Sequence, residues 1–400
     1  MLQPRFSWEL ISAVRNTLQA QYQIQVARSE SDLQQNKLVW DSGRVSSPAS
    51  NQVIYQGPPL QCMQRYYWQV QTWDNRNLPS GRSKPASFEM GLLQSGDWQG
   101  KWITPDLPED IAQSNPSPYL RRAFPIRKTV ASARIYATAM GLYELELNGR
   151  RVGDQYFTPG WTAYDFRYQY QTYDVTSQVR MGENCLGAIL GDGWFRGYLV
   201  WAGARNTYGD TLGLLAQLVL TFTDGTREVI GTDENWKAAT GPILASDIYN
   251  GETYIARLEH PGWSRPGYDE ETWKGVKVAS PPKASVQLVA PSGPPVRKIE
   301  EIRPVKLQRA PSGEYLLDMG QNMVGWIRFQ VRASSGTKIV LRHAEVLDKS
   351  GELYTDNLRS AKQTITYIAG GGDVQVLRAA LHFPGFPPCR DPRLARRTEA

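Results

Sequence analysis

The sequence predicts an all-β protein made of tandem β-sandwiches. Apolar and polar residues alternate in Tyr22–Val26, Trp68–Gln71, Tyr143–Leu147 and Ile327–Val331. Such alternation is typical of antiparallel sheets that pack one face against a core and leave the other in water. Asn-Gly, Asp-Gly and Ser-Gly pairs, which favour tight turns, separate the strands, and no long segment has the spacing of an amphipathic helix.

Length and composition indicate several domains. The chain has 400 residues, of which 41% are hydrophobic, enough for about two to four domains with their own cores. Gly91–Trp98 is polar and contains glycine, and Ser280–Pro295 is rich in proline and serine, as interdomain linkers often are. The expected divisions are domains at residues 1–92, 96–285 and 296–376, and a separate tail at residues 377–400.

The charge distribution argues against a nucleic-acid partner. The net charge is +6, but residues 377–400 contain five arginines against two acidic residues, so the rest of the chain is close to neutral. No stretch is apolar over the length of a membrane span, and no basic-then-apolar leader opens the chain. The three cysteines lie far apart and form no zinc motif. We therefore expect a cytoplasmic protein with no membrane or nucleic-acid partner.

Two carboxylates on one strand are the first candidates for hydrolytic chemistry. Glycosidases use two carboxyl groups on either side of the bond that breaks. Glu144 and Glu146 would share one face of the predicted strand Tyr143–Leu147, roughly 6.5–7 Å apart. The same pattern describes the solvent-facing side of an ordinary strand, and we favour that interpretation.

Two glycine-containing loops, Pro159–Asp165 and Gly191–Gly197, carry tryptophan beside charged residues. Glycine permits tight turns, and an indole face beside polar groups can hold a sugar ring and its hydroxyl groups. The alternative is that the tryptophans only anchor the loops. The predicted sugar-binding residues are Trp161, Asp165, Asp192, Trp194 and Arg196. Asp165 and Asp192 are also candidate calcium ligands, although no dense spacing of acidic residues supports a calcium site.

Seven motifs follow one another along residues 1–376. They are Pro4–Trp8, Tyr66–Val70, Leu147–Asp154, Pro159–Asp165, Gly191–Trp194, Asp318–Gly325 and Arg342–Leu347. Together they resemble the N-terminal part of bacterial-type α-L-rhamnosidases of glycoside hydrolase family 78. The resemblance implies a fibronectin-III-like sandwich, then the family's jelly-roll-like N-terminal sandwich, then a concanavalin-like sandwich.

The resemblance also implies which functions to expect. The family hydrolyses terminal α-L-rhamnosyl groups with inversion, using carboxylates on a C-terminal (α/α)6 barrel. No residue here corresponds to that barrel, so no catalytic residue is assigned and the chain is expected to be inactive alone. The implied ligands are L-rhamnose-containing glycans or glycosides. Some family members bind rhamnose with calcium, and nothing in the sequence indicates the oligomeric state.

The end of the sequence departs from the family pattern. After Val376 the family would continue as Glu-Pro-Arg-Phe-Thr-Phe, whereas this chain continues as Leu-Arg-Ala-Ala-Leu-His. The genetic code permits the family string in a frame shifted by one nucleotide. We therefore expect a frameshift near residues 373–377, an incomplete third domain of low stability, and an out-of-frame or disordered tail.

Two other functions stay open at this point. One is a stand-alone carbohydrate-binding or adhesion protein with no enzymatic activity. The other is an active hydrolase that uses Glu144 and Glu146. An assay of the 400-residue chain on an aryl α-L-rhamnoside separates the second from the rest.

Overall fold

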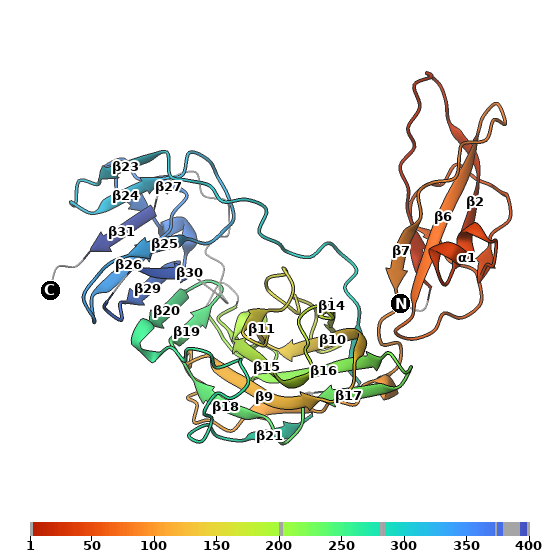
Figure 1. Cartoon of the computed structure of the whole chain (residues 1–400). Helices are drawn as coiled ribbons and strands as arrows, with labels where there is room; N and C mark the ends of the chain where they lie inside the picture. Colours follow the sequence, from red (N-terminus) through yellow and green to blue (C-terminus); the bar gives the residue numbers. More distant parts are fainter. Residues whose placement is uncertain are drawn as a thin grey trace. The chain divides into compact units, whose positions relative to one another are not determined.

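The computed structural model describes residues 3–199, 203–280, 283, 285–372, 374–378 and 393–397. It is nearly all sheet, with 41% of residues in strands and 5% in helices, which confirms the predicted all-β class (Figure 1). The chain divides into two compact units, Met1–Trp98 and Gln99–Ala400. No helix in the described part is long and apolar enough to span a membrane.

The first unit is a small sandwich around an aromatic core. Its main sheet has the order β3-β2-β6-β7 with β4 beside β2. A second sheet pairs β1 (Arg5–Phe6) with β5 (Val53–Ile54), and the helical segments are α1 (Glu30–Gln34) and η1 (Ser95–Asp97). The main strands span Trp40–Asp41 (β3), Gln19–Ala27 (β2), Arg65–Asp74 (β6), Ala86–Glu89 (β7) and Val45–Ser46 (β4).

Alternation places the apolar residues of β2 and β6 in this core. Ile24 and Val26 are fully buried, and on β6 Tyr66 and Val70, the partner of Ile24, are nearly buried. Phe6 packs on Trp68 with ring centroids 4.7 Å apart. The aromatic content of the sequence is thus used for packing in this unit.

The second unit begins with a larger sandwich of two sheets. The first sheet has the order β14-β10-β16-β8-β21 with β17 beside β16, and the second has the order β12-β11-β15-β9-β18. Apolar side chains from both sheets form one core. The strands of the first sheet are β14 (Gln171–Asp174), β10 (Val130–Met140), β16 (Gly213–Phe222), β8 (Trp102–Pro105), β21 (Val276–Ala279) and β17 (Arg227–Gly231). Those of the second are β12 (Arg150–Arg151), β11 (Leu142–Leu147), β15 (Gly182–Gly191), β9 (Pro118–Ile126) and β18 (Lys237–Thr240).

Two central strands are buried on both faces. β16 is the longest apolar run in the sequence, and nine of its ten residues are buried. The outer side of β15 and β9 is covered by a second cluster that includes Tyr119, Trp263 and Trp273. A strand covered on both sides needs no polar face, which explains why β16 lacks the alternation seen elsewhere.

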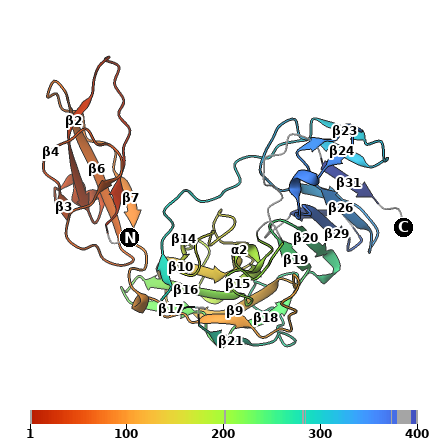
Figure 2. The same ribbon diagram turned by 180° about the vertical axis from the view of Figure 1, so that it is seen from behind.

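A seven-stranded sheet follows, with the order β19-β20-β29-β26-β31-β24-β23. β20 runs parallel to β29, while the other neighbours in this sheet are antiparallel. Figures 1 and 2 show β19 and β20 beside β29 and β26. The strands are β19 (Ile243–Asp247), β20 (Gly251–Ile255), β29 (Thr364–Ile368), β26 (Lys338–Arg342), β31 (Arg393–Arg397), β24 (Tyr315–Asp318) and β23 (Lys306–Arg309).

This sheet joins segments from both sides of Ser280–Pro295, the predicted linker. Within that segment, β22 (Gln287–Val289) pairs in parallel with β13 (Arg167–Gln169). β30 (Gln375–Arg378) pairs with β25 (Arg328–Val331). The remaining short elements are β27 (Val346–Leu347), β28 (Leu353–Tyr354), η2 (Ala256–Leu258) and η3 (Asp356–Leu358).

The predicted tail is structured in part. Residues 375–378 form β30, and residues 393–397 form β31 between β24 and β26. Residues 377–378 and 393–397 of the predicted out-of-frame or disordered tail thus lie in strands. Residues 379–392 and 398–400 lie outside the described residues.

Candidate functional site

The loop after β15 contains three of the five predicted sugar-binding residues. It turns directly into a single helical turn, α2 (Gly193–Arg196). Gly193 has a φ of +54°, and a Cβ there would lie 2.5 Å from Leu142 Cγ, so this position requires glycine. The turn separates the three side chains: Trp194 is half-buried, whereas Asp192 and Arg196 are buried.

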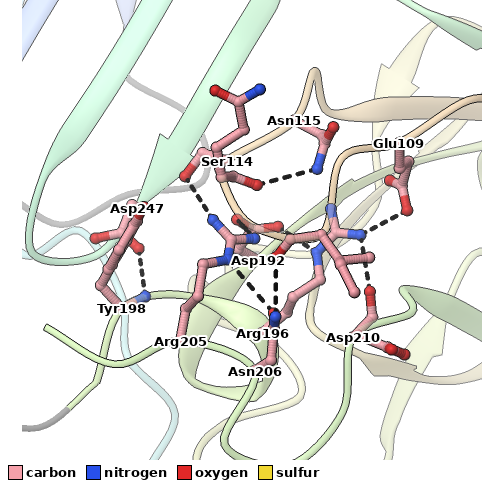
Figure 3. A network of polar contacts seen from close by, with 12 residues as sticks. Glu109, Ser114, Asn115, Asp192, Arg196, Tyr198, Arg205, Asn206, Asp210 and Asp247 are labelled. Carbon is pink, nitrogen blue, oxygen red and sulfur yellow. Dashed lines mark hydrogen bonds and ion pairs between the residues drawn. The ribbon is translucent and has the colours of Figure 1, made fainter.

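A network of ion pairs surrounds the Arg196 guanidinium (Figure 3). Its Nε donates to Asp192 Oδ1 at 2.7 Å, and its Nη1 donates to Glu109 Oε2 at 2.7 Å. Nη1 also reaches the backbone oxygen of Asp210 at 3.3 Å. Arg205 Nη2 contacts the second oxygen of Asp192 at 3.3 Å.

The same network joins loops that are far apart in the sequence. Arg205 Nη1 donates to Ser114 Oγ at 3.4 Å, and Asn206 Nδ2 donates to the backbone oxygen of Ile111 at 2.9 Å. Asp247, at the end of β19, accepts from the backbone N–H of Tyr198 at 2.8 Å. The segment between β8 and β9, which contains Glu109, Ile111 and Ser114, is thereby hydrogen-bonded to the α2 turn and to the loop that follows it.

The electrostatics of the network favour the charged form of Arg196 but oppose the charged form of Asp247. Burial opposes the charge of Arg196, but Asp192 and Glu109 outweigh it and raise the pKa of Arg196 above its usual value. Burial raises the pKa of Asp247, against the three backbone N–H groups that stabilise its charged form. Asp192 is 3% exposed and Arg196 1%. Their polar atoms are engaged internally, so the structure favours a supporting role for these two predicted sugar contacts.

Trp161 and Trp194, the latter in α2, form an aromatic surface. Their rings are stacked, with centroids 5.9 Å apart and an interplanar angle of 7°. Trp161 is 52% exposed, and its Nε1 donates to the Tyr208 hydroxyl at 3.3 Å. Phe157 meets the edge of Trp194 at 5.9 Å. We call these four residues, Phe157, Trp161, Trp194 and Tyr208, the Trp161 platform.

Asp165 lies on the surface and is paired with a lysine. Its Oδ1 is 2.8 Å from Lys283 Nζ, and both side chains are about half exposed. Among the described residues, no group of three or more His, Cys, Asp or Glu is placed to hold a metal ion. Asp165 and Asp192 each lie beside a cationic side chain, so the donor set does not fit calcium.

Glu144 and Glu146 are not the solvent-facing pair that the sequence indicated. Glu144 is paired with Arg151 at 3.3 Å, and Glu146 accepts a hydrogen bond from Ser264. Both side chains are partly buried. Burial raises the pKa of Glu144, while Arg151 opposes the shift. Each carboxylate therefore has a structural partner of its own.

Three family models match the chain in succession. They are the Rha78A-like N-terminal immunoglobulin domain over residues 1–94, the alpha-L-rhamnosidase N-terminal domain over residues 128–300, and the bacterial alpha-L-rhamnosidase concanavalin-like domain over residues 308–389. The chain belongs to the α-L-rhamnosidase family. The predicted resemblance is thus confirmed.

Curated relatives and solved structures in the α-L-rhamnosidase family align along almost the whole chain. An α-L-rhamnosidase of Formosa agariphila is 37% identical over 96% of this chain and 42% of its own length. The α-L-rhamnosidase structure from Aspergillus terreus has a TM-score of 0.89 at 36% identity, covering 98% of this chain and 44% of that one. The Streptomyces avermitilis enzyme complexed with L-rhamnose has a TM-score of 0.90 at 30% identity, covering 98% and 54%. The chain spans about half the length of the curated relatives it matches.

The sequence did not reveal Glu109, Arg205 or Tyr208 as part of this site. Glu109 is separated from Arg196 by 87 positions, and Tyr208 from Trp161 by 47. No motif or spacing links such residues, because their proximity depends on how loops from different strands meet. The glycine-flanked tryptophans were the only local signal.

Proposed function

We propose that this chain is a non-hydrolytic, sugar-binding part of an α-L-rhamnosidase polypeptide, and that the Trp161 platform contacts terminal L-rhamnosyl groups. The observation that carries the proposal is the exposed ring of Trp161 stacked on the half-buried ring of Trp194. An aromatic face can pack against the C–H side of a sugar ring, and the Tyr208 hydroxyl offers a polar group beside it. The complex of the Streptomyces avermitilis relative with L-rhamnose supports the choice of sugar.

The platform is held in place before any ligand arrives. Trp194 lies between Gly193, which packs against Leu142, and the buried Arg196 ion pairs. A site whose side chains are already fixed loses less conformational entropy on binding. The buried charges therefore support the aromatic surface even though they do not contact the sugar.

The same geometry supports the absence of hydrolysis in this chain. A glycosidase needs an acid and a second carboxylate on opposite sides of the scissile bond. Glu144 and Glu146 lie on one strand face and are held by Arg151 and Ser264. We expect no turnover of an aryl α-L-rhamnoside by the 400-residue chain. Turnover that disappears in Glu146→Gln would contradict this.

Calorimetric titration with L-rhamnose tests the binding role. Trp161→Ala should weaken binding at least about tenfold, which corresponds to about 1.4 kcal/mol, because the exposed stacking face is lost. Trp161 is half exposed, so the variant should remain folded. Trp73→Ala is the control, since Trp73 lies in the first unit under Arg44. Equal affinity of the wild type and Trp161→Ala for L-rhamnose would contradict the platform proposal.

A further inference from the structure

A hollow lies on the same sandwich, between β9 and β17, each of which has an unpaired edge there. β9 pairs with β18 only through residues 118–121, so residues 122–126 of β9 have no strand on that side among the described strands, and β17 pairs only with β16 among them. Between the free edges is a hollow of about 410 Å³, within the roughly 300–1,000 Å³ typical of small-molecule sites. We call it the β9–β17 groove.

Charged side chains of both signs line the groove. Arg122 and Arg127 come from the β9 side, and Glu228 and Asp233 come from β17 and the residues after it. Arg122 Nη1 is 3.6 Å from Asp233 Oδ1, with about 30% of each side chain exposed, so this pair is loose. Arg127 and Glu228 are exposed and form no ion pair or side-chain hydrogen bond with the described residues.

The balance of charges indicates what the groove can bind. Two guanidinium groups offer donors, two carboxylates offer acceptors, and the four charges cancel. A phosphate or other strong anion would meet the carboxylates, and a cation would meet the arginines. Sugar hydroxyl groups both donate and accept hydrogen bonds, so a neutral sugar can use both kinds of group at once.

We propose that the β9–β17 groove binds an uncharged oligosaccharide, at a site separate from the Trp161 platform. Arg122 lies opposite Leu186 on β15, six residues before Asp192. At the rise of a β-strand this separation is about 20 Å. The two sites are therefore far enough apart to bind sugar independently.

The competing explanation is protection of the strand edges. Charged residues and proline on an exposed edge prevent pairing with another chain, and Pro125 also lines the groove. Edge protection requires charges that repel another strand and a proline that lacks an N–H donor. It does not require a hollow lined by equal numbers of donor and acceptor groups. The two explanations differ in whether removing the charges changes sugar binding.

Calorimetry with rutinose, a neutral rhamnosyl-glucose disaccharide, tests the groove in the Trp161→Ala protein. We expect residual binding in this variant, and a loss of at least about tenfold when Arg127→Ala and Glu228→Gln are added. Both residues are exposed, so the fold should be retained. Arg227→Ala is the matched control, because Arg227 is an exposed neighbour on β17 that does not line the groove. This control should bind as tightly as its parent.

The outcomes separate the groove from the platform. No rutinose binding by folded Trp161→Ala, or unchanged binding after the groove substitutions, overturns the groove. If the groove substitutions leave rutinose binding unchanged but increase aggregation, the charged residues protect the strand edges. That result also overturns the groove proposal. If Trp161→Ala binds like the wild type and the groove substitutions abolish binding, the groove stands and the platform proposal fails.

Discussion

At the residue scale, neighbours in the sequence have different roles in the α2 turn. Trp194 contributes a half-exposed ring to the platform, whereas Asp192 and Arg196, two positions away on either side, are buried in ion pairs. Buried pairs of this kind add little net stability relative to apolar packing, but removing one partner leaves uncompensated charge. Arg196 therefore matters for the fold of the site more than for contact with a ligand.

Arg196→Leu should destabilise the second unit by about 3 kcal/mol, because Glu109 loses its cation and Asp192 retains only Arg205. Urea unfolding followed by tryptophan fluorescence measures the change. Arg150→Leu, at an exposed arginine of β12, serves as the control and should change stability by no more than about 0.5 kcal/mol. A cost for Arg196→Leu as small as that of the control would show that the network is not required.

At the element scale, the β19–β20 hairpin ties the large sandwich to the seven-stranded sheet. The hairpin follows β18 of the sandwich, and β20 pairs in parallel with β29 over Gly251–Ile255. Gly251 has a φ of +100°, and a Cβ there would collide with the backbone oxygen of Thr364. A close approach of two backbones therefore requires glycine at the start of this pairing.

Gly251→Ala tests the importance of this junction. It should lower the stability of the second unit by the cost of a positive φ, about 1–2 kcal/mol, plus about 1–3 kcal/mol for the clash. Gly225→Ala is a matched control, because Gly225 has a φ of +81° and open space around its Cα. The difference in stability between the two variants, measured by thermal unfolding, gives the cost of the clash. Equal losses of stability in both variants would mean that the β20–β29 pairing accommodates the added Cβ without destabilisation.

At the scale of the whole molecule, the chain consists of two compact units that divide after Trp98. Each has its own hydrophobic clusters, and the cores of the second unit include no residue of the first. Units with separate cores can unfold in separate cooperative transitions. Calorimetry of the full chain should therefore show two transitions.

Asp97 distinguishes the two transitions by their pH dependence. Its Oδ2 accepts from the backbone N–H groups of Leu93 and Gln94 at 2.8 and 2.9 Å. Burial acts to raise the pKa of Asp97, but these bonds and that from Cys62 lower it below 3.8. A lowered pKa means that the stabilisation is present above 3.8 and disappears as pH falls through the folded-state value.

Asp97→Ala should therefore destabilise the first unit by about 1 kcal/mol at neutral pH. At a pH well below the folded-state pKa of Asp97, the pH-dependent part of the stability difference between the wild type and Asp97→Ala should vanish. The transition of the second unit is the internal control and should not move. Calorimetric scans at neutral and strongly acidic pH provide the measurement. A shift of both transitions would contradict the division into two units.

The sequence by itself determined the fold class and the positions of the aromatic loops. Alternation in segments such as Tyr22–Val26 and Tyr143–Leu147 is a local property, because side chains of a strand point to opposite faces whatever the strand pairs with. Glycine beside Trp161 and Trp194 likewise marks turns through backbone conformation alone. These features need no knowledge of distant residues.

Only the tertiary structure decided which of these residues face solvent and which segments pair. It buried Asp192 and Arg196, covered Glu144 and Glu146, and brought β20 beside β29 across more than a hundred positions. Such contacts depend on the packing of sheets and on loops from different strands meeting at one place. A local pattern encodes which face of a strand is apolar, but what covers that face is a property of the whole fold.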